Sequence, residues 1–364
     1  MSLLDRKIRR VKAQRACLDH AVALIQTRPG PILELGLGNG RTYHHLGQLL
    51  TNEGLGREIF VFEREVAAHP DCVPGRVHLF LGDFQETLGL ALTRLGPVAV
   101  LAHADFGSAD EEATAATSRV VARALPRLLT PGALVASDQD IPFAEAESLP
   151  LPRGVEPGWY FLWQLPKAAE SGVQTHHRRA WSKSSHRASQ YNPCSTRAGR
   201  NVASRLDSFI RRLEAQRNCL DLAADLVRGL EGPVLELGLG NGRTYDHLRA
   251  LLPEHEIFVF DRRVKAFSNC VPDRKHLILG DIRDTLPAAV RRFRRSVVLV
   301  HSDMGSGNRE ASIRLAAFIA SQLPGLMRPG GLVVADEDEA FERSNPVPLP
   351  DGVRPGRYFM YRAS

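Results

Sequence analysis

Apolar and polar residues alternate along the chain in two different periods, and the complete pattern occurs twice. Short, nearly continuous apolar runs, typical of buried strands, are separated by stretches in which apolar residues recur every three or four positions, typical of amphipathic helices. Each half opens with such a helix, expected at Leu4–Gln26 and Leu206–Arg228. Apolar strands that alternate with helices favour an α/β fold, with a parallel, doubly wound sheet covered on both faces.

The same series of elements is expected in both halves. A short strand, a glycine turn and a helix come first, and the later strands end at acidic residues or in turns. The later strands are expected at 58–63, 77–83, 98–101, 133–136 and 159–164, and again at 256–261, 276–281, 297–300, 332–335 and 357–362. Few residues follow the fifth strand of each half, so one strand at this edge of the sheet is expected to be missing or very short.

A duplication sets the domain organisation. Ten residues, ELGLGNGRTY, occur at Glu34–Tyr43 and again at Glu236–Tyr245. A repeat this long indicates tandem domains rather than a solenoid. We expect one domain at 1–166, a second at 205–364, and between them a Ser-, Arg- and His-rich linker at 167–204 that is disordered.

The positive charge of the chain is concentrated in that linker. The formal net charge is +6, and residues 167–204 contain seven Lys and Arg residues but only one acidic residue, Glu170. The basic balance therefore does not indicate a basic binding face on either domain, which weakens a nucleic-acid-binding interpretation.

Cysteine usage and hydropathy favour a cytoplasmic protein. The five cysteines are an odd number without paired local spacing, and no zinc-binding pattern is present. The chain shows no secretory leader pattern and no apolar run of membrane-spanning length.

The duplicated glycine turn is the first candidate for a binding site. Glycines lack the Cβ that keeps a ligand away from the backbone, and a turn that opens a helix presents backbone N–H groups. The dinucleotide fingerprint would require glycine where Arg41 and Arg243 stand, so NAD binding is disfavoured. A tight turn without any ligand is the structural alternative. The glycines of the two turns are Gly36, Gly38 and Gly40, and Gly238, Gly240 and Gly242.

The pattern acidic-x-Gly-x-Gly-x-Gly resembles the first motif of class I S-adenosylmethionine (SAM) methyltransferases. The resemblance covers about residues 4–165 and 206–362, and each half is similar to a group of small bacterial SAM methyltransferases. It implies two tandem Rossmann-like domains that bind SAM and release S-adenosylhomocysteine (SAH).

The resemblance also implies roles for the acidic residues of each half. Glu34 and Glu236 would position the amino group of SAM, below a turn that takes its methionine part. Glu63 and Asp261, which end the second strand, would accept hydrogen bonds from the ribose hydroxyls. Asp83 and Asp281 would contact the adenine amine.

The residues after the fourth strand are the catalytic candidates. They are His103 and Asp105, with His301 and Asp303 in the second half. Histidine suits a general base because its pKa lies near neutrality, although a histidine that only hydrogen-bonds the adjacent loop is an equal alternative. We predict no metal site. If a divalent ion were bound, as in catechol-type methyltransferases, Asp105 with Asp138 and Asp303 with Asp336 would hold it.

We therefore expect a methyltransferase that acts on a small-molecule acceptor. The alternatives are a SAM-binding regulatory or scaffold protein with one or both halves non-catalytic, and an RNA methyltransferase that uses the basic linker. The apolar stripes of the two opening helices further predict that the halves pack as a pseudo-dimer. The alternative is two independent domains, each of which buries its own stripe.

Overall fold

The computed structural model of the protein describes residues 1–108, 110–168, 203–305 and 308–364. These residues form two compact units: the repeat-1 unit, Arg9–Phe209, and the repeat-2 unit, Met1–Ile8 together with Ile210–Ser364. The linker expected at 167–204 lies, apart from its two ends, outside the described residues. The boundaries 1–166 and 205–364 stay predictions.

Each unit contains a seven-stranded, mainly parallel sheet. In the repeat-1 unit the strand order is β3-β2-β1-β4-β5-β7-β6, and in the repeat-2 unit it is β10-β9-β8-β11-β12-β14-β13. The strands of the first sheet are β1 (Ile32–Leu35), β2 (Ile59–Glu63), β3 (Leu79–Leu81), β4 (Ala99–Ala104), β5 (Leu129–Ser137), β6 (Glu147–Ser148) and β7 (Phe161–Gln164). Those of the second are β8 (Val234–Leu237), β9 (Ile257–Asp261), β10 (Leu277–Leu279), β11 (Val297–Ser302), β12 (Met327–Ala335), β13 (Ser344–Pro346) and β14 (Phe359–Ala363).

In the described residues, four α-helices accompany each sheet. In the first repeat they are α1 (Leu3–Leu24), α2 (Arg41–Asn52), α3 (Phe84–Leu95) and α4 (Glu111–Ala124), and in the second α5 (Arg205–Val227), α6 (Arg243–Leu251), α7 (Ile282–Phe293) and α8 (Arg309–Leu326). None of the helices in the described part of the chain is long and apolar enough to cross a membrane.

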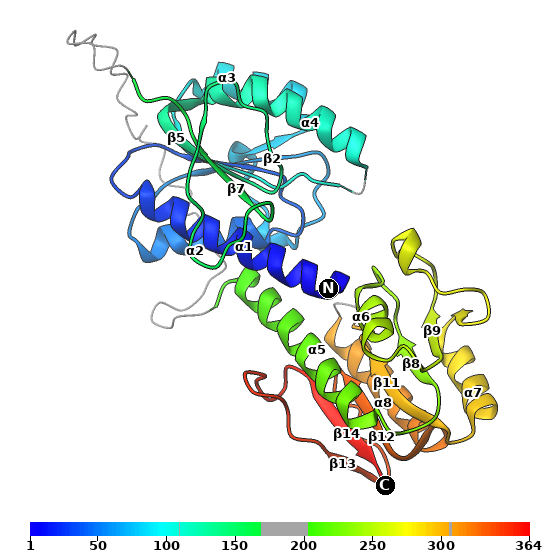
Figure 1. The fold of residues 1–364 in the computed structure, drawn as a ribbon. Helices are drawn as coiled ribbons and strands as arrows, with labels where there is room; N and C mark the ends of the chain where they lie inside the picture. Colours follow the sequence, from blue (N-terminus) through cyan, green and yellow to red (C-terminus); the bar gives the residue numbers. More distant parts are fainter. Residues whose placement is uncertain (109, 169–202, 306–307) are drawn as a thin grey trace. The chain divides into compact units, whose positions relative to one another are not determined.

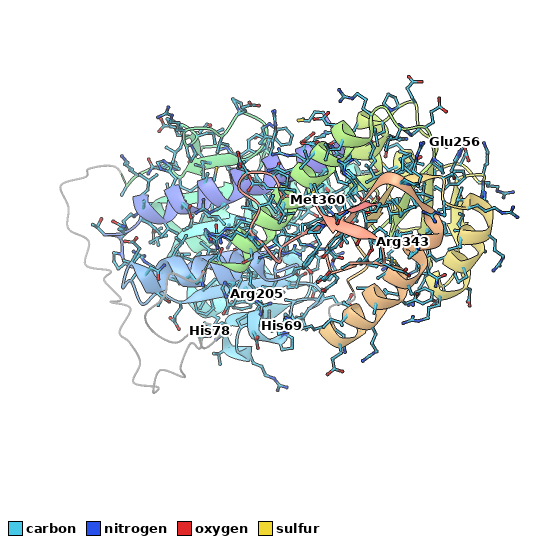
Figure 2. The ribbon with its side chains drawn as sticks, turned by 90° about the horizontal axis from the view of Figure 1, so that it is seen from below. His69, His78, Arg205, Glu256, Arg343 and Met360 are labelled. Atoms are coloured by element: carbon cyan, nitrogen blue, oxygen red, sulfur yellow. The ribbon has the colours of Figure 1, made fainter. Side chains whose placement is uncertain are left out.

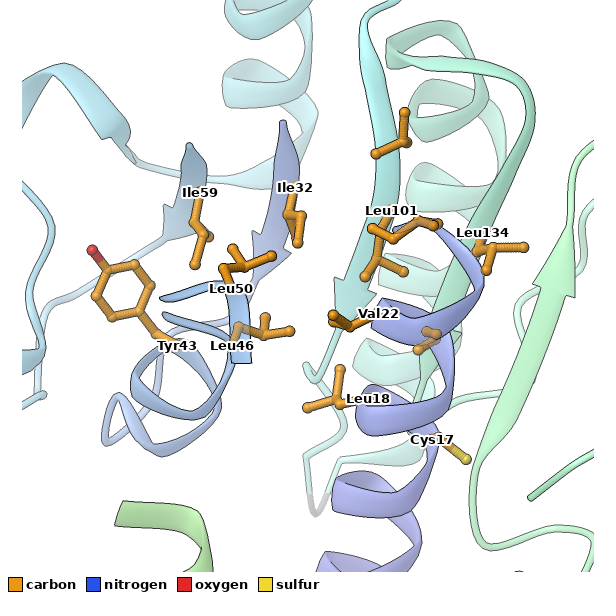
Figure 3. Close-up of a cluster of buried hydrophobic side chains, with 14 of the residues drawn as sticks. Cys17, Leu18, Val22, Ile32, Tyr43, Leu46, Leu50, Ile59, Leu101 and Leu134 are labelled. Carbon is orange, nitrogen blue, oxygen red and sulfur yellow. The ribbon is translucent and has the colours of Figure 1, made fainter. Parts of the chain in front are cut away.

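The helices of the repeat-1 unit cover both faces of its sheet (Figure 1). On one face, buried side chains of α1 and α2 pack against strand residues such as Ile32 and Leu101 (Figure 3). On the other face, Leu88 of α3 and Val121 of α4 pack against strand residues such as Leu33. The expected doubly wound α/β fold is confirmed, and the switch point between β1 and β4 places the ends of these strands beside a crevice for ligands.

The last strand of each unit belongs to a hairpin with a very short partner. The strand β6 has two residues and β13 has three, and both pair antiparallel with the strand that follows them. In the repeat-2 unit, Met360, which is labelled in Figure 2, lies on β14. It is in register with Val334 of β12. The expected missing or very short strand is therefore present, in the very short form.

Both opening helices begin with a capping box. Ser2 Oγ accepts a hydrogen bond from the N–H of Asp5 (3.1 Å), while the carboxylate of Asp5 accepts one from Ser2 N (3.3 Å). Ser204 and Asp207 repeat this exchange at 2.9 and 3.2 Å. Reciprocal bonds of this kind satisfy N–H groups that have no partner inside the helix.

Each capping serine also ends a partly buried chain of hydrogen bonds. In the repeat-2 unit, Ser2 Oγ lies 2.9 Å from Nδ1 of His247, whose Nε2 lies 2.9 Å from Asp221. In the repeat-1 unit, Ser204 makes the same contact with His45 at 2.9 Å, and Asp19 completes the chain at 2.8 Å. These bonds tie Met1–Ile8 to the second repeat and residues up to Phe209 to the first.

Candidate active site

The glycine turn after β1 leaves one of its three glycines facing open space. Gly36, Gly38 and Gly40 have φ values of 94°, 49° and 72°. A Cβ at Gly36 would collide with the carbonyl oxygen of Asp105, and a Cβ at Gly40 with the side chain of Cys72, whereas a Cβ at Gly38 would meet no atom within 4 Å. Packing thus requires Gly36 and Gly40, and the backbone at Gly38 is open to a ligand.

The second turn has the same construction. Gly238, Gly240 and Gly242 have φ values of 95°, 51° and 81°. A Cβ at Gly240 would again meet nothing within 4 Å, and a Cβ at Gly238 would lie 2.8 Å from the carbonyl oxygen of Asp303. Both repeats therefore place the backbone of the fourth-strand aspartate against the first glycine of the turn.

The acid that ends the second strand binds the glycine turn. Oε2 of Glu63 accepts hydrogen bonds from the N–H groups of Leu37 (2.8 Å) and Gly38 (2.9 Å), and Oε1 accepts one from Arg64 N (2.8 Å). Asp261 accepts the equivalent bonds from the second turn at 2.9 and 3.2 Å. Two groups of candidate cofactor residues are thus brought together in each unit.

These bonds set the electrostatic character of the turn. A glycine turn that opens a helix normally binds anions through its free N–H groups and the positive end of the helix dipole. Here a carboxylate occupies two of those N–H groups, so an approaching phosphate would meet negative charge. The site instead offers carboxylate oxygens, which accept hydrogen bonds from hydroxyl groups and favour a positively charged ligand.

Below the turn, Glu34 is completely buried and hydrogen-bonded at both oxygens. Oε1 accepts a bond from the Thr42 hydroxyl, and Oε2 lies 2.7 Å from Nδ1 of His103. The other ring nitrogen of His103 lies 2.5 Å from the Tyr160 hydroxyl. Glu34 therefore supports the turn from beneath and does not face solvent.

His103 has no ring nitrogen left for a substrate in this arrangement. Its side chain is fully buried. Burial alone would lower the pKa of His103, but the charge and hydrogen bond of Glu34, together with the charges of two nearby aspartates, outweigh burial and the pKa is raised. In the second repeat, His301 has the same partners, Glu236 at 2.7 Å and Tyr358 at 3.1 Å, and its pKa is raised in the same way. The geometry favours a supporting position for both histidines, and their role as bases stays a prediction.

The fourth-strand aspartate is more accessible and belongs to a cluster with an arginine. The side chain of Asp105 is 28% exposed. Nη2 of Arg10 lies 2.5 Å from Asp105 and 2.8 Å from Asp138, which ends the fifth strand, and Nε2 of Gln14 donates to Asp105 at 2.7 Å. Burial and the Asp105 carboxylate raise the pKa of Asp138.

The repeat-2 unit contains the matching cluster. Arg212 bonds both Asp303 and Asp336, the latter at 3.2 Å, and Gln216 donates to Asp303 at 2.8 Å. Burial, followed by the Asp303 carboxylate, raises the pKa of Asp336 to about 7. The carboxylates considered for a metal are thus bonded to an arginine in both repeats. In the described residues no group of three or more His, Cys, Asp or Glu side chains is placed to hold a metal ion.

Asp83 and Asp281 have a structural function at the third strand end. Asp83 caps α3 by accepting a bond from Gln85 N (3.0 Å), and it pairs with Arg64 at 2.7 Å. Asp281 caps α7 and pairs with Arg262 at 2.8 Å. The backbone hydrogen bond is the main cause that lowers the pKa of Asp83. Contact of these aspartates with an adenine amine stays a prediction.

Sequence reasoning missed the arginine and glutamine of the opening helix. Arg10 and Gln14 stand four residues apart, as do Arg212 and Gln216, so each pair lies on one helix face. The recurrence of this spacing in both repeats was the available signal. This spacing did not show that the helix face with the arginine and glutamine would contact the strand-end aspartates.

Comparison with known proteins decides the family. A family model described as S-adenosyl-L-methionine methyltransferase matches residues 1–165 and 203–363. The chain belongs to this family. It is a SAM-dependent methyltransferase built as a tandem duplicate, as the sequence predicted. Among curated proteins there is no match.

Several solved structures are similar to parts of the chain. The S-adenosyl-L-methionine methyltransferase of Silicibacter pomeroyi DSS-3 has 47% identity, covers 45% of this chain and 100% of its own, and has a TM-score of 0.44. DesVI of Streptomyces venezuelae has 19% identity over 39% of this chain and 62% of its own, with a TM-score of 0.27. An O-methyltransferase family protein from Burkholderia thailandensis has 14% identity over 44% and 59%, with a TM-score of 0.27.

Proposed function

We propose that each repeat binds one SAM molecule and transfers its methyl group to a small-molecule acceptor. The observation that carries this proposal is the carboxylate of Glu63, and of Asp261, bonded to the N–H groups of the glycine turn. SAM has ribose hydroxyls, a positive sulfonium and no phosphate, so it suits a turn that presents negative charge. NAD would place its pyrophosphate against that carboxylate.

When bound, SAM would supply a methyl group on a positively charged sulfur, and the sulfur would leave as part of SAH when the acceptor takes the methyl group in line. The residues of this chain align the reactants and exclude water. Gly38 and Gly240 leave room at the turn, while the buried pairs Glu34–His103 and Glu236–His301 hold the strand ends in place. We infer that Asp105 and Asp303, the partly exposed acids, contact the acceptor.

Ligand release from the purified full-length chain tests the cofactor. Mass spectrometry of heat-released ligand should detect SAM or SAH, and calorimetry with SAH should give two sites per chain. Heat evolved with NADH in place of SAH would contradict the proposal. Stoichiometric SAH binding without methyl transfer to any tested small-molecule pool would favour the regulatory alternative.

We further infer that the two repeats act as a fused dimer and that the protein is cytoplasmic. The grouping of Met1–Ile8 with the second repeat, and of residues 203–209 with the first, supports the fused dimer. Small-angle scattering that shows two independently moving lobes would contradict it. Four buried free cysteines in the described residues are consistent with a reducing compartment, which fractionation of the native host tests.

A further inference from the structure

The aspartate pair at the ends of β4 and β5 has no free oxygen in the repeat-1 unit. Asp105 accepts bonds from Arg10 and Gln14. Asp138 accepts bonds from Arg10, from the side chain of Gln139 (2.9 Å) and from the backbone N–H groups at 106 and 107 (3.3 and 3.2 Å). All four carboxylate oxygens therefore already bind N–H donors.

A divalent ion does not fit this arrangement. Magnesium requires near-octahedral oxygen ligands about 2.0–2.1 Å away, and an ion that bridges two carboxylates must lie between them. That position is occupied by Nη2 of Arg10, at 2.5 Å from Asp105 and 2.8 Å from Asp138. A guanidinium keeps its charge and donates without accepting, so it can neither leave by deprotonation nor ligate the ion.

Charge explains why a resident cation is needed. The Asp138 side chain is 2% exposed, and two carboxylates this close repel each other. Burial alone would lower the pKa of Arg10, but Asp105 and Asp138 outweigh it and the pKa is raised. Arg212 shows the same balance, in which Asp303 makes the largest opposing contribution to burial. The same partly buried cation is thus present in both units.

We propose that Arg10 and Arg212 are resident cations, each of which takes the place of a divalent ion between the strand-end aspartates. They act as positioning residues: each arginine fixes the geometry of the aspartate pair beside the glycine turn and balances its negative charge. That the aspartate pair lies at the acceptor end of the site rests on the proposed function. Exclusion of a metal ion by the arginine can be measured without cofactor or acceptor.

Titration of the full-length chain with MnCl₂, followed by electron paramagnetic resonance, tests the assignment. The wild-type chain should show no saturable Mn²⁺ binding up to about 1 mM. Arg10→Gln/Arg212→Gln exposes two uncompensated aspartate pairs and should gain up to two Mn²⁺ sites, at least about tenfold tighter than any wild-type signal. Arg9→Gln/Arg211→Gln, on exposed positions of the same helices, is the matched control and should stay like wild type.

Two results would overturn the assignment. One is wild-type Mn²⁺ binding that disappears in Asp138→Asn/Asp336→Asn. The other is a folded glutamine variant that still excludes Mn²⁺. If the glutamine variant does not fold, Arg10→Lys/Arg212→Lys decides, because a retained point charge should exclude Mn²⁺ and uptake would contradict the proposal. SAH titration of the same wild-type sample tests the proposed function separately, so the two can fail independently.

Discussion

The two repeats share their glycine turns and aspartate–arginine clusters but differ at one buried pair beside them. In the repeat-2 unit, the Ser302 hydroxyl donates to Oε1 of Glu339 at 2.6 Å, and Oε2 of Glu339 is buried without a partner in the described residues. The corresponding residues of the repeat-1 unit are Ala104 and Ile141, both buried.

This difference shows that the duplicated glycine turns and aspartate–arginine clusters can persist while their surroundings change. An apolar pair in the first repeat needs no hydrogen-bond partner, whereas a buried carboxyl group is costly unless it is neutral or paired. Burial is the main cause that raises the pKa of Glu339, to about 8. The repeat-2 unit therefore carries a proton near its site that the repeat-1 unit lacks.

The largest expected effect concerns the first glycine of the turns. Gly36→Ala combines a positive φ of 94° with a collision against the Asp105 carbonyl, and we expect a loss of about 3 kcal/mol or more in the stability of the repeat-1 unit. Gly238→Ala should cost less, because its nearest backbone atom is 2.8 Å away. Hydrogen exchange followed by mass spectrometry measures the stability of each unit separately.

Gly54→Ala separates the two causes of this loss. Its φ is 64°, and a Cβ there would meet no atom within 4 Å, so it reports backbone strain alone. A loss in Gly36→Ala no greater than in Gly54→Ala would show that the close approach of the turn to Asp105 is unimportant.

Glu339 should make the stability of the repeat-2 unit depend on pH. The folded state keeps the proton up to about pH 8, whereas the unfolded chain releases it near 4.5, so the unfolded state binds fewer protons between these values. The stabilisation from this group is complete below about pH 4.5 and is lost as pH rises to about 8. Each pH unit in this range should cost about 1.4 kcal/mol, so we expect a loss of about 3 kcal/mol between about pH 5 and 7, measured by calorimetric unfolding.

Exchanging the buried pair of one repeat for that of the other tests whether this pair causes the pH dependence. Ser302→Ala/Glu339→Ile copies the first repeat and should remove most of this pH dependence from the repeat-2 unit. The reverse change, Ala104→Ser/Ile141→Glu, should introduce it into the repeat-1 unit. An unchanged pH profile after the first exchange would mean that another group, with Asp336 the first to examine, causes the dependence.

Loss of the strand-end acid should weaken cofactor binding in one repeat at a time. Glu63→Ala and Asp261→Ala each remove hydrogen bonds to a ligand and to the turn, and we expect about 2 kcal/mol, or roughly thirtyfold, in the SAH affinity of the altered repeat. Calorimetry should then resolve one tight and one weak site. Glu65→Ala, at an exposed neighbouring acid, is the control, and equal weakening by that variant would contradict the assignment.

The smallest effect is expected at the helix-capping serines. Ser2→Ala and Ser204→Ala each remove a cap and a bond to a buried histidine, which should cost about 1 kcal/mol. Because Ser2 bonds His247, its loss should increase hydrogen exchange in the second repeat, while Ser204→Ala should do so in the first. The opposite assignment of effects would contradict the division of the chain at Ile8 and Phe209.

Much of the fold follows from local sequence. The apolar runs and the helical periods placed the main strands and most of the helices within a few residues, because a buried parallel strand and an amphipathic helix each impose a period on their own side chains. The duplicated glycine turn likewise predicted the cofactor end of the site, which stays a prediction. The very short strands β6 and β13 carried no period long enough to locate them.

By itself, the sequence determined the two doubly wound repeats, the SAM family and the acids at the strand ends. Only the tertiary structure decided what those side chains bond. Glu63 lies on the turn, His103 is enclosed by Glu34 and Tyr160, and Arg10 lies between Asp105 and Asp138. The physical reason is distance along the chain. Arg10 and Asp138 meet only because a helix packs over a sheet edge, and the hydrophobic periodicity of a single helix or strand cannot predict such a contact.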